Sequence, residues 1–208
     1  DDFFSVFSVW SGGIAIYGAI IGGFIGGAAY IMIRNSEWFL ATWRTVFPFM
    51  GEAHRANLPG IGRLADITAP ALLLAQAIGR LGDIINGEHF SKVTELPWGV
   101  IYTNANSPGI FRPPTHPAVG YELIFDLLLL AAIWPLRDRL RPHGMFFTLY
   151  LATYSIGRFF LSFLREEFNV YFGGTLNEAQ VVAIIVVIFT VPLLVWKAQI
   201  VRPAASRA

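Results

Sequence analysis

The stretch Gly79–Glu88 reads Gly-Arg-Leu-Gly-Asp-Ile-Ile-Asn-Gly-Glu and directly follows a largely apolar run, Ile67–Ile78. With its flanks this run is long enough to cross a bilayer, which places Arg80 and Asp83 at or near membrane depth. An arginine there costs roughly 2.5 kcal/mol or more unless something pairs with it. The stretch is therefore a candidate functional site, although Arg80 alone also fits a helix end whose side chain snorkels to the interface.

Two later apolar runs carry charged residues of the same kind. Glu122 and Asp126 are four residues apart early in one of them, so they share a helix face. Arg158 and Arg165 are seven residues apart in the next and stack on one face. A guanidinium group binds phosphate through a planar fork and keeps its charge. The arginines therefore favour a site for an anionic group, whereas the two carboxylates either face protein or lie close to the interface.

The composition indicates a membrane protein. Of the 208 residues, 55% are apolar, 15% aromatic and only 14% charged, against roughly 25% charged residues in an ordinary soluble domain. The net charge of +1 gives no argument for a nucleic-acid partner. The absence of cysteine excludes disulfides, thiolate metal sites and a cysteine nucleophile within these 208 residues.

The apolar runs predict an all-α fold, a polytopic membrane bundle of about five transmembrane helices forming one transmembrane domain over 1–208. The longest polar segment, 89–116, is expected to form a small external loop between the second and third spans. The aromatic stretch Glu37–Met50 resembles a helix lying in the interface. The expected spans are Gly12–Ile33, Ala65–Ile85, Ala118–Pro135, Gly144–Leu164 and Asn177–Trp196.

Basic residues in the connections predict the orientation, because cytoplasmic loops carry an excess of lysine and arginine. One side of the membrane has the connections with Arg34, Arg44, Arg55, Arg63, Arg137, Arg139, Arg141, Lys197, Arg202 and Arg207. The other side has only Lys92, Arg112 and Arg165. This alternation predicts a cytoplasmic C-terminus and places the candidate site residues, together with Tyr17, toward the external leaflet.

Three motifs in order resemble the prolipoprotein diacylglyceryl transferase family. Gly79–Glu88 is similar to the family signature Gly-Arg-hydrophobic-Gly-Asn-two hydrophobics-Asn-Gly-Glu. His-Pro-Ala-Val-Gly-Tyr-Glu, at 116–122, is similar to its His-Pro-x-x-Leu-Tyr-Glu. Gly-Arg-Phe-Phe-Leu-Ser-Phe-Leu-Arg, at 157–165, is similar to its late arginine-rich helix. The resemblance begins at Trp10-Ser-Gly-Gly-Ile-Ala-Ile-Tyr-Gly and covers most of the chain.

The resemblance implies seven transmembrane helices with a cytoplasmic C-terminus in the bacterial plasma (inner) membrane. The five spans would be the last five, with the first two missing from an N-terminally truncated chain. It also implies transfer of the diacylglyceryl group from phosphatidylglycerol to the lipobox cysteine thiol of a preprolipoprotein, with release of glycerol 1-phosphate. The implied partners are those two substrates and membrane lipid, with no cofactor and no metal.

Carried over residue by residue, the resemblance implies catalytic roles for Arg80, Arg158, Tyr17 and His116. It implies substrate binding by Arg80, Asp83, Asn86, Gly87, Glu88, Tyr121, Glu122 and Arg165. This chain departs from the family pattern in three places: Tyr17 stands where many members have histidine, Asp83 replaces asparagine, and Ser162 replaces a frequent glutamate. We expect Tyr17 to donate a hydrogen bond, because a tyrosine of pKa about 10 is a poor base. His116 is either the base or a cap on the third span.

Two other readings fit the same residues. A transporter for an anionic solute would also place arginines in glycine-rich membrane helices, but it would normally show an internal repeat, and the sequence has none. A structural membrane protein would use the charges only as pairs, Arg80 with Asp83 and Arg158 with Glu122. That reading leaves the three ordered motifs unexplained.

Overall fold

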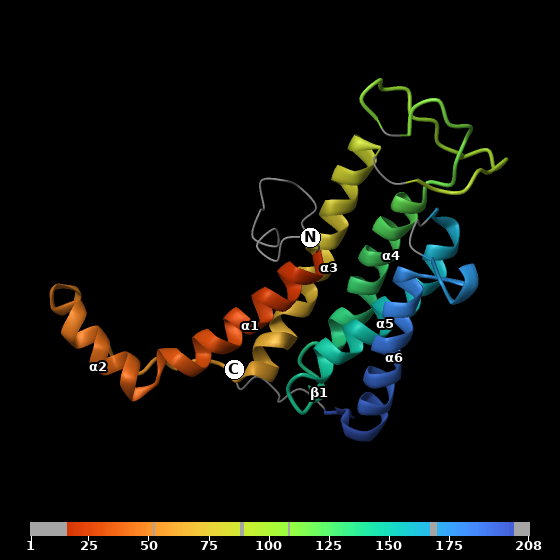
Figure 1. Cartoon of the computed structure of the whole chain (residues 1–208). Helices are drawn as coiled ribbons and strands as arrows, with labels where there is room; N and C mark the ends of the chain where they lie inside the picture. The colour runs from red at the N-terminus through yellow and green to blue at the C-terminus, as the bar shows by residue number, and fades with distance from the viewer. Residues whose placement is uncertain (1–15, 52, 88–89, 108, 167–169, 202–208) are drawn as a thin grey trace, which may run out of the picture. The chain divides into compact units, whose positions relative to one another are not determined.

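The computed structural model describes residues 16–51, 53–87, 90–107, 109–166 and 170–201 (Figure 1). The chain divides into two compact units, Asp1–Ile61 and Gly62–Ala208, each with its own internal contacts. The single domain expected over 1–208 stays a prediction.

The N-terminal unit is built from helices. Ser36 caps the second of them, because its hydroxyl accepts the Phe39 N–H at 3.2 Å. In this helix Leu40 is buried, whereas Trp38 is 70% exposed. One apolar side chain of the helix therefore packs inside the protein, and another lies on its outer surface. The expected span Gly12–Ile33 begins outside the described residues, and α1 covers its remainder. The elements of this unit are α1 (Ile16–Arg34), α2 (Glu37–Val46) and the 3₁₀ turn η3 (Pro48–Met50).

The second unit contains four long helices that match the four later predicted spans within a few residues. Among the described residues, four segments are long and apolar enough to cross a membrane, which confirms a polytopic helical bundle. The helices are α3 (Ile61–Asn86), α4 (Ala118–Ile133), α5 (Met145–Leu161) and α6 (Glu178–Lys197). The 3₁₀ turn η4 (Trp134–Leu136) extends α4, and η5 (Ser162–Leu164) extends α5.

Helix α5 lies at the centre of the packing and contacts both α4 and α6 (Figure 1). Its Phe146 is fully buried against Leu73 of α3 and Ile133 of α4. Large apolar side chains on the outside remain uncovered, among them Phe189 at 72% and Val195 at 83% exposure. An apolar surface of this extent suits contact with lipid.

The start of α3 is fixed against the start of α5. The Asp66 carboxylate accepts the N–H groups of Gly144 at 2.8 Å and Phe147 at 3.0 Å, so a side chain of α3 caps α5. A Cβ atom at Gly62 would lie 2.6 Å from the His143 carbonyl oxygen, so only glycine permits this approach. These contacts set the relative height of two helices that run in the same direction.

Short strands join the connections at the two ends of the bundle. β1 (Leu140–Arg141) pairs antiparallel with β4 (Gln199–Ile200), with Leu140 opposite Ile200. β2 (Val170–Tyr171) pairs antiparallel with β3 (Leu176–Asn177), around the 3₁₀ turn η6 (Phe172–Gly174).

The described part of the predicted loop 89–116 is extended. Thr115 forms isolated bridges with Val93 and with Val100, and Tyr102 forms one with Ile110. Val100 and Tyr102 thus both take part in bridges within the loop.

Candidate functional site

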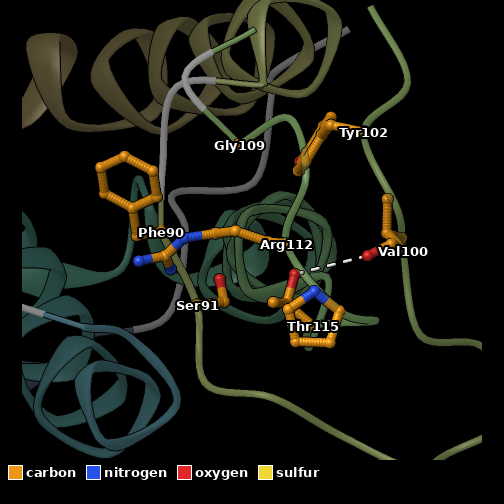
Figure 2. Close-up of a pocket in the computed structure, with 8 residues that line it drawn as sticks. Phe90, Ser91, Val100, Tyr102, Gly109, Arg112 and Thr115 are labelled. Carbon is orange, nitrogen blue, oxygen red and sulfur yellow. Dashed lines mark hydrogen bonds between the residues drawn. The ribbon is translucent and has the colours of Figure 1, made fainter.

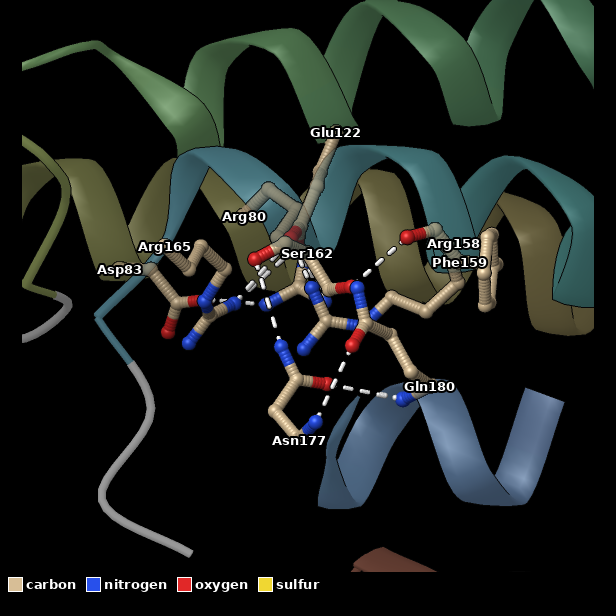
Figure 3. Close-up of polar contacts among 9 residues, drawn as sticks. All are labelled: Arg80, Asp83, Glu122, Arg158, Phe159, Ser162, Arg165, Asn177 and Gln180. Atoms are coloured by element: carbon tan, nitrogen blue, oxygen red, sulfur yellow. Dashed lines mark hydrogen bonds and ion pairs between the residues drawn. The ribbon is translucent and has the colours of Figure 1, made fainter. Parts of the chain in front are cut away.

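One buried glutamate gathers three arginines that are distant in sequence. Glu122, in the first turns of α4, is 3% exposed. Its Oε2 lies 2.6 Å from Nη2 of Arg80, and its Oε1 accepts hydrogen bonds from Nη1 of Arg158 and, at 3.1 Å, from Nη1 of Arg165. Figure 3 shows the three side chains pointing toward this carboxylate from α3, from α5 and from the residue after η5. We call these four residues the Glu122 cluster.

The register of the helices explains why Arg80 and Arg158 meet. Arg80 lies fourteen residues after Asp66, and Arg158 lies fourteen residues after Gly144. At 1.5 Å rise per residue, each arginine lies about 21 Å along its helix from the Asp66–Gly144 contact. Because α3 and α5 run in the same direction, a contact at one end brings the two arginines to the same height at the other.

Arg80 has a second carboxylate partner besides Glu122. It pairs with Asp83, whose Oδ2 lies 3.0 Å from Nη1 one turn further along α3. Nε of Arg80 is buried and has no hydrogen-bond acceptor among the described residues. The arrangement therefore keeps a guanidinium donor that could bind an anionic group.

The described part of the loop 89–116 is tied to the cluster through the backbone around Arg165. Ser91 forms an antiparallel bridge with Arg165. The Lys92 N–H donates to the Leu164 carbonyl at 3.0 Å, and the Glu166 N–H donates to the Phe90 carbonyl at 3.1 Å. These bonds fix the position from which the Arg165 side chain enters the cluster.

Ser162 supports the end of the arginine-bearing helix. It is 1% exposed, and its hydroxyl donates to the Phe159 carbonyl at 2.7 Å. Its own carbonyl accepts the Asn177 side-chain amide at 3.4 Å. Asn177 forms a capping box with Gln180 at the start of α6 (Figure 3). The position that often holds glutamate in the family therefore links α5 to α6 here.

The end of the signature needs a glycine. Helix α3 ends at Asn86, which is exposed, and Gly87 has φ +65°. The Ser107 hydroxyl donates a hydrogen bond to the Gly87 carbonyl at 3.1 Å. A Cβ atom at Gly87 would lie only 2.3 Å from Oγ of Ser107. Gly87 thus anchors the loop 89–116. Glu88 lies outside the described residues, so its predicted role in substrate binding stays a prediction.

His116 and Tyr121 lie where the loop enters α4. The Tyr121 hydroxyl accepts the Trp98 indole N–H at 2.7 Å, and the His116 and Tyr121 rings are 6.3 Å apart. The His116 carbonyl accepts the Ala118 N–H at 2.8 Å, which fits a role in starting the helix. Within the described residues no hydrogen bond or ion pair joins His116 to the Glu122 cluster. Its role as a base stays a prediction.

Tyr17 belongs to α1, in the N-terminal unit, and its side chain is outside the described part of the structure. Its predicted hydrogen bond within the site therefore stays a prediction. A residue that the predictions did not assign to the site is Asp126, which is 1% exposed on α4 one turn after Glu122. In the sequence, its spacing of four residues from Glu122 was the signal that could have assigned Asp126 to the site.

A small hollow in the loop 89–116 is lined by residues that do not belong to the Glu122 cluster. Figure 2 shows Arg112 stacked on the Phe90 ring, with its guanidinium carbon 4.2 Å from the ring centre. Arg112 also pairs with Glu166 at 2.7 Å. Burial, followed by the nearby Asp83 charge, raises the pKa of the Tyr102 phenol beside the hollow. Tyr102 therefore stays protonated at neutral pH and serves as a neutral wall of the loop.

The fold and the Glu122 cluster define a polytopic membrane protein with a buried cluster of arginines in its helical bundle. A family model described as prolipoprotein diacylglyceryl transferase matches residues 53–196. The chain belongs to this family. Asp83, Glu122, Arg158 and Arg165 all lie within the matched segment, as does Arg80.

Several curated relatives carry the name phosphatidylglycerol–prolipoprotein diacylglyceryl transferase. The chain is 37% identical to the relative from Nocardia farcinica over 172 residues, which are 76% of this chain and 30% of the relative. It is 35% identical to the relative from Synechococcus elongatus over 216 residues, 97% of this chain and 66% of the relative. With the relative from Acaryochloris marina it shares 35% identity over 184 residues, 86% of this chain and 58% of the relative. The chain thus spans less than two thirds of the length of these relatives.

Proposed function

We propose that the protein transfers the sn-1,2-diacylglyceryl group of phosphatidylglycerol to the lipobox cysteine thiol of a preprolipoprotein. The thiol sulfur forms a new bond to the glycerol carbon that carries the phosphate. The carbon–oxygen bond to that phosphate breaks, and glycerol 1-phosphate leaves with the electron pair. The thiol proton passes to a base, and the product on the peptide is a thioether.

The observation that carries this proposal is the convergence of Arg80, Arg158 and Arg165 on the single buried carboxylate of Glu122. The phosphodiester of phosphatidylglycerol carries one negative charge and offers several acceptor oxygens. Arginine suits it better than lysine, because its fork donates two parallel hydrogen bonds to a phosphate. Glu122 keeps the three guanidinium groups together when no anion is bound.

The same cluster would favour the transition state over the bound lipid. As the carbon–oxygen bond breaks, the phosphate gains a second negative charge inside a bundle of low dielectric constant. Donors that are already oriented toward those oxygens stabilise the new charge without reorganising. An interaction that is stronger in the transition state than in the ground state raises kcat.

The substrates suit a protein embedded in a membrane. Phosphatidylglycerol reaches the cluster laterally from the lipid, and the signal peptide of a preprolipoprotein is itself a membrane segment. The excess of basic residues in the connections 34–63, 137–141 and 197–207 supports a cytoplasmic C-terminus in the bacterial inner membrane. The cluster then lies toward the external leaflet.

A transfer assay tests the proposal. Vesicles that contain the complete protein and phosphatidylglycerol labelled in its acyl chains are incubated with a lipobox peptide. We expect label on the peptide as a thioether, together with released glycerol phosphate. A peptide with Cys→Ser at the acceptor is the control and should stay unlabelled, because a hydroxyl is barely ionised at neutral pH. Flux of an anionic solute without any thioether would instead support a transporter.

A further inference from the structure

Asp126 is a buried carboxylate that the stability of the fold does not explain. It is 1% exposed and is one of the largest fully buried side chains of the described structure. Neither Oδ1 nor Oδ2 has a hydrogen-bond partner among the described residues. Burial of a carboxylate without partners is costly, and such groups are rare in native proteins. The cost points to a role in function.

The groups around Asp126 act on it through their electric field and do not occupy it. Glu122 precedes it by one turn on α4, and the charges of Arg80 on α3 and Arg158 on α5 act on it. Its own charge acts on Tyr150 and Tyr154 of α5. The Tyr150 hydroxyl is directed to the side-chain oxygen of Gln76, 3.2 Å away. Within the described residues, no hydrogen-bond donor thus occupies the lone pairs of Asp126.

Its depth places Asp126 beside the reacting atoms of the lipid. Four residues further along α4 correspond to about 6 Å from Glu122 toward the middle of the span. A lipid whose phosphate is held at the height of Glu122 directs its acyl chains inward and its headgroup glycerol outward. The carbon under attack therefore lies on the inner side of the phosphate, which is the side of Asp126.

We propose that Asp126 accepts the proton of the incoming cysteine thiol. The proposal rests on the transferase function proposed above. The carboxylate takes the proton as the sulfur–carbon bond forms, and the resulting carboxylic acid then returns the proton to the departing glycerol phosphate or to water. Asp126 would thus supply the base, a role to which a tyrosine, with an ordinary pKa of about 10, is poorly suited.

The test compares the complete wild-type protein with Asp126→Asn, which keeps the shape of the side chain and removes the proton acceptor. Initial rates of transfer from phosphatidylglycerol to a lipobox peptide are measured from pH 5 to 10. We expect Asp126→Asn to lower kcat by about 10²–10⁴-fold, while KM for phosphatidylglycerol stays within about twofold. The residual rate should rise about tenfold per pH unit until the thiol ionises near pH 8.5. Asp126→Glu should keep the wild-type profile at a reduced rate.

Unfolding in detergent separates catalysis from structure. Asp126→Asn should be at least as stable as the wild type, because it removes an uncompensated buried charge. Asp66→Asn is the matched control: it weakens the cap on α5, so it should lower stability and leave the shape of the pH profile unchanged.

Three results for the Asp126→Asn variant would overturn the proposal. The first is a wild-type pH profile, and the second is a raised KM with unchanged kcat, which would indicate a role in headgroup binding. The third is that the variant fails to fold. A wild-type protein that forms no thioether would instead overturn the proposed function itself.

Discussion

Replacing Glu122 by glutamine removes the single negative charge around which three guanidinium groups gather. Its carboxylate lies 2.6 Å from Arg80 Nη2 and 3.1 Å from Arg165 Nη1, and it also pairs with Arg158. Glu122 is 3% exposed and the arginine side chains are 9–18% exposed, so water compensates little. Breaking one buried pair costs about 3–5 kcal/mol, because the remaining charge stays buried. We expect Glu122→Gln to lower the free energy of unfolding by this amount.

Equilibrium unfolding in detergent micelles measures this loss, and two further variants identify its cause. Glu122→Asp keeps the charge and should cost less than Glu122→Gln. In the Glu122→Gln background, Arg165→Gln removes one of the uncompensated cations, so the two losses should fall short of their sum by about 1–3 kcal/mol. A loss below about 1 kcal/mol for Glu122→Gln, or strictly additive losses, would refute the view that this carboxylate holds the cluster together.

Three other predictions concern packing, the family departure and topology. Gly157→Ala should destabilise the protein by about 1–3 kcal/mol, because a Cβ atom there would lie 2.0 Å from the Phe125 ring; adding Phe125→Ala should restore part of the loss in the same unfolding assay. Tyr17→Phe should slow transfer on the order of tenfold, the effect of about 1.4 kcal/mol from one hydrogen bond; complete loss of transfer with intact lipid binding would make Tyr17 a direct participant in proton transfer. Cysteines introduced at Ser107 and Arg139 should differ toward an impermeant thiol reagent added outside, with only the first labelled; equal labelling would contradict the orientation.

The helices could be predicted from the sequence because their signal is local. Runs of about twenty apolar residues located the last four spans. Pairs at helical spacing were equally predictable. Arg80 pairs with Asp83 three residues later. Arg158 and Arg165, seven residues apart, both contact Glu122.

The shared use of Glu122 could not be predicted from local spacing. It depends on the relative height of α3 and α5, which is set at their other ends by Asp66 and Gly144. The sequence shows only an aspartate in one helix and a glycine before another, without indicating that they meet. The lack of a hydrogen-bond partner for Asp126 among the described residues could not be predicted either. It can be recognised only when the positions of all neighbouring helices are known.

The central claim is that the arginine cluster holds the lipid phosphate through paired hydrogen bonds, and Arg80→Lys tests it most directly. The measurement is the initial rate of thioether formation from labelled phosphatidylglycerol. Arg63→Lys, an exposed substitution near the start of the same helix, serves as the matched control. Lysine keeps the charge and loses the fork, so Arg80→Lys should recover little of the activity lost in Arg80→Ala, while Arg63→Lys should transfer at the wild-type rate. A near-normal rate for Arg80→Lys would show that charge alone suffices and would contradict the claim.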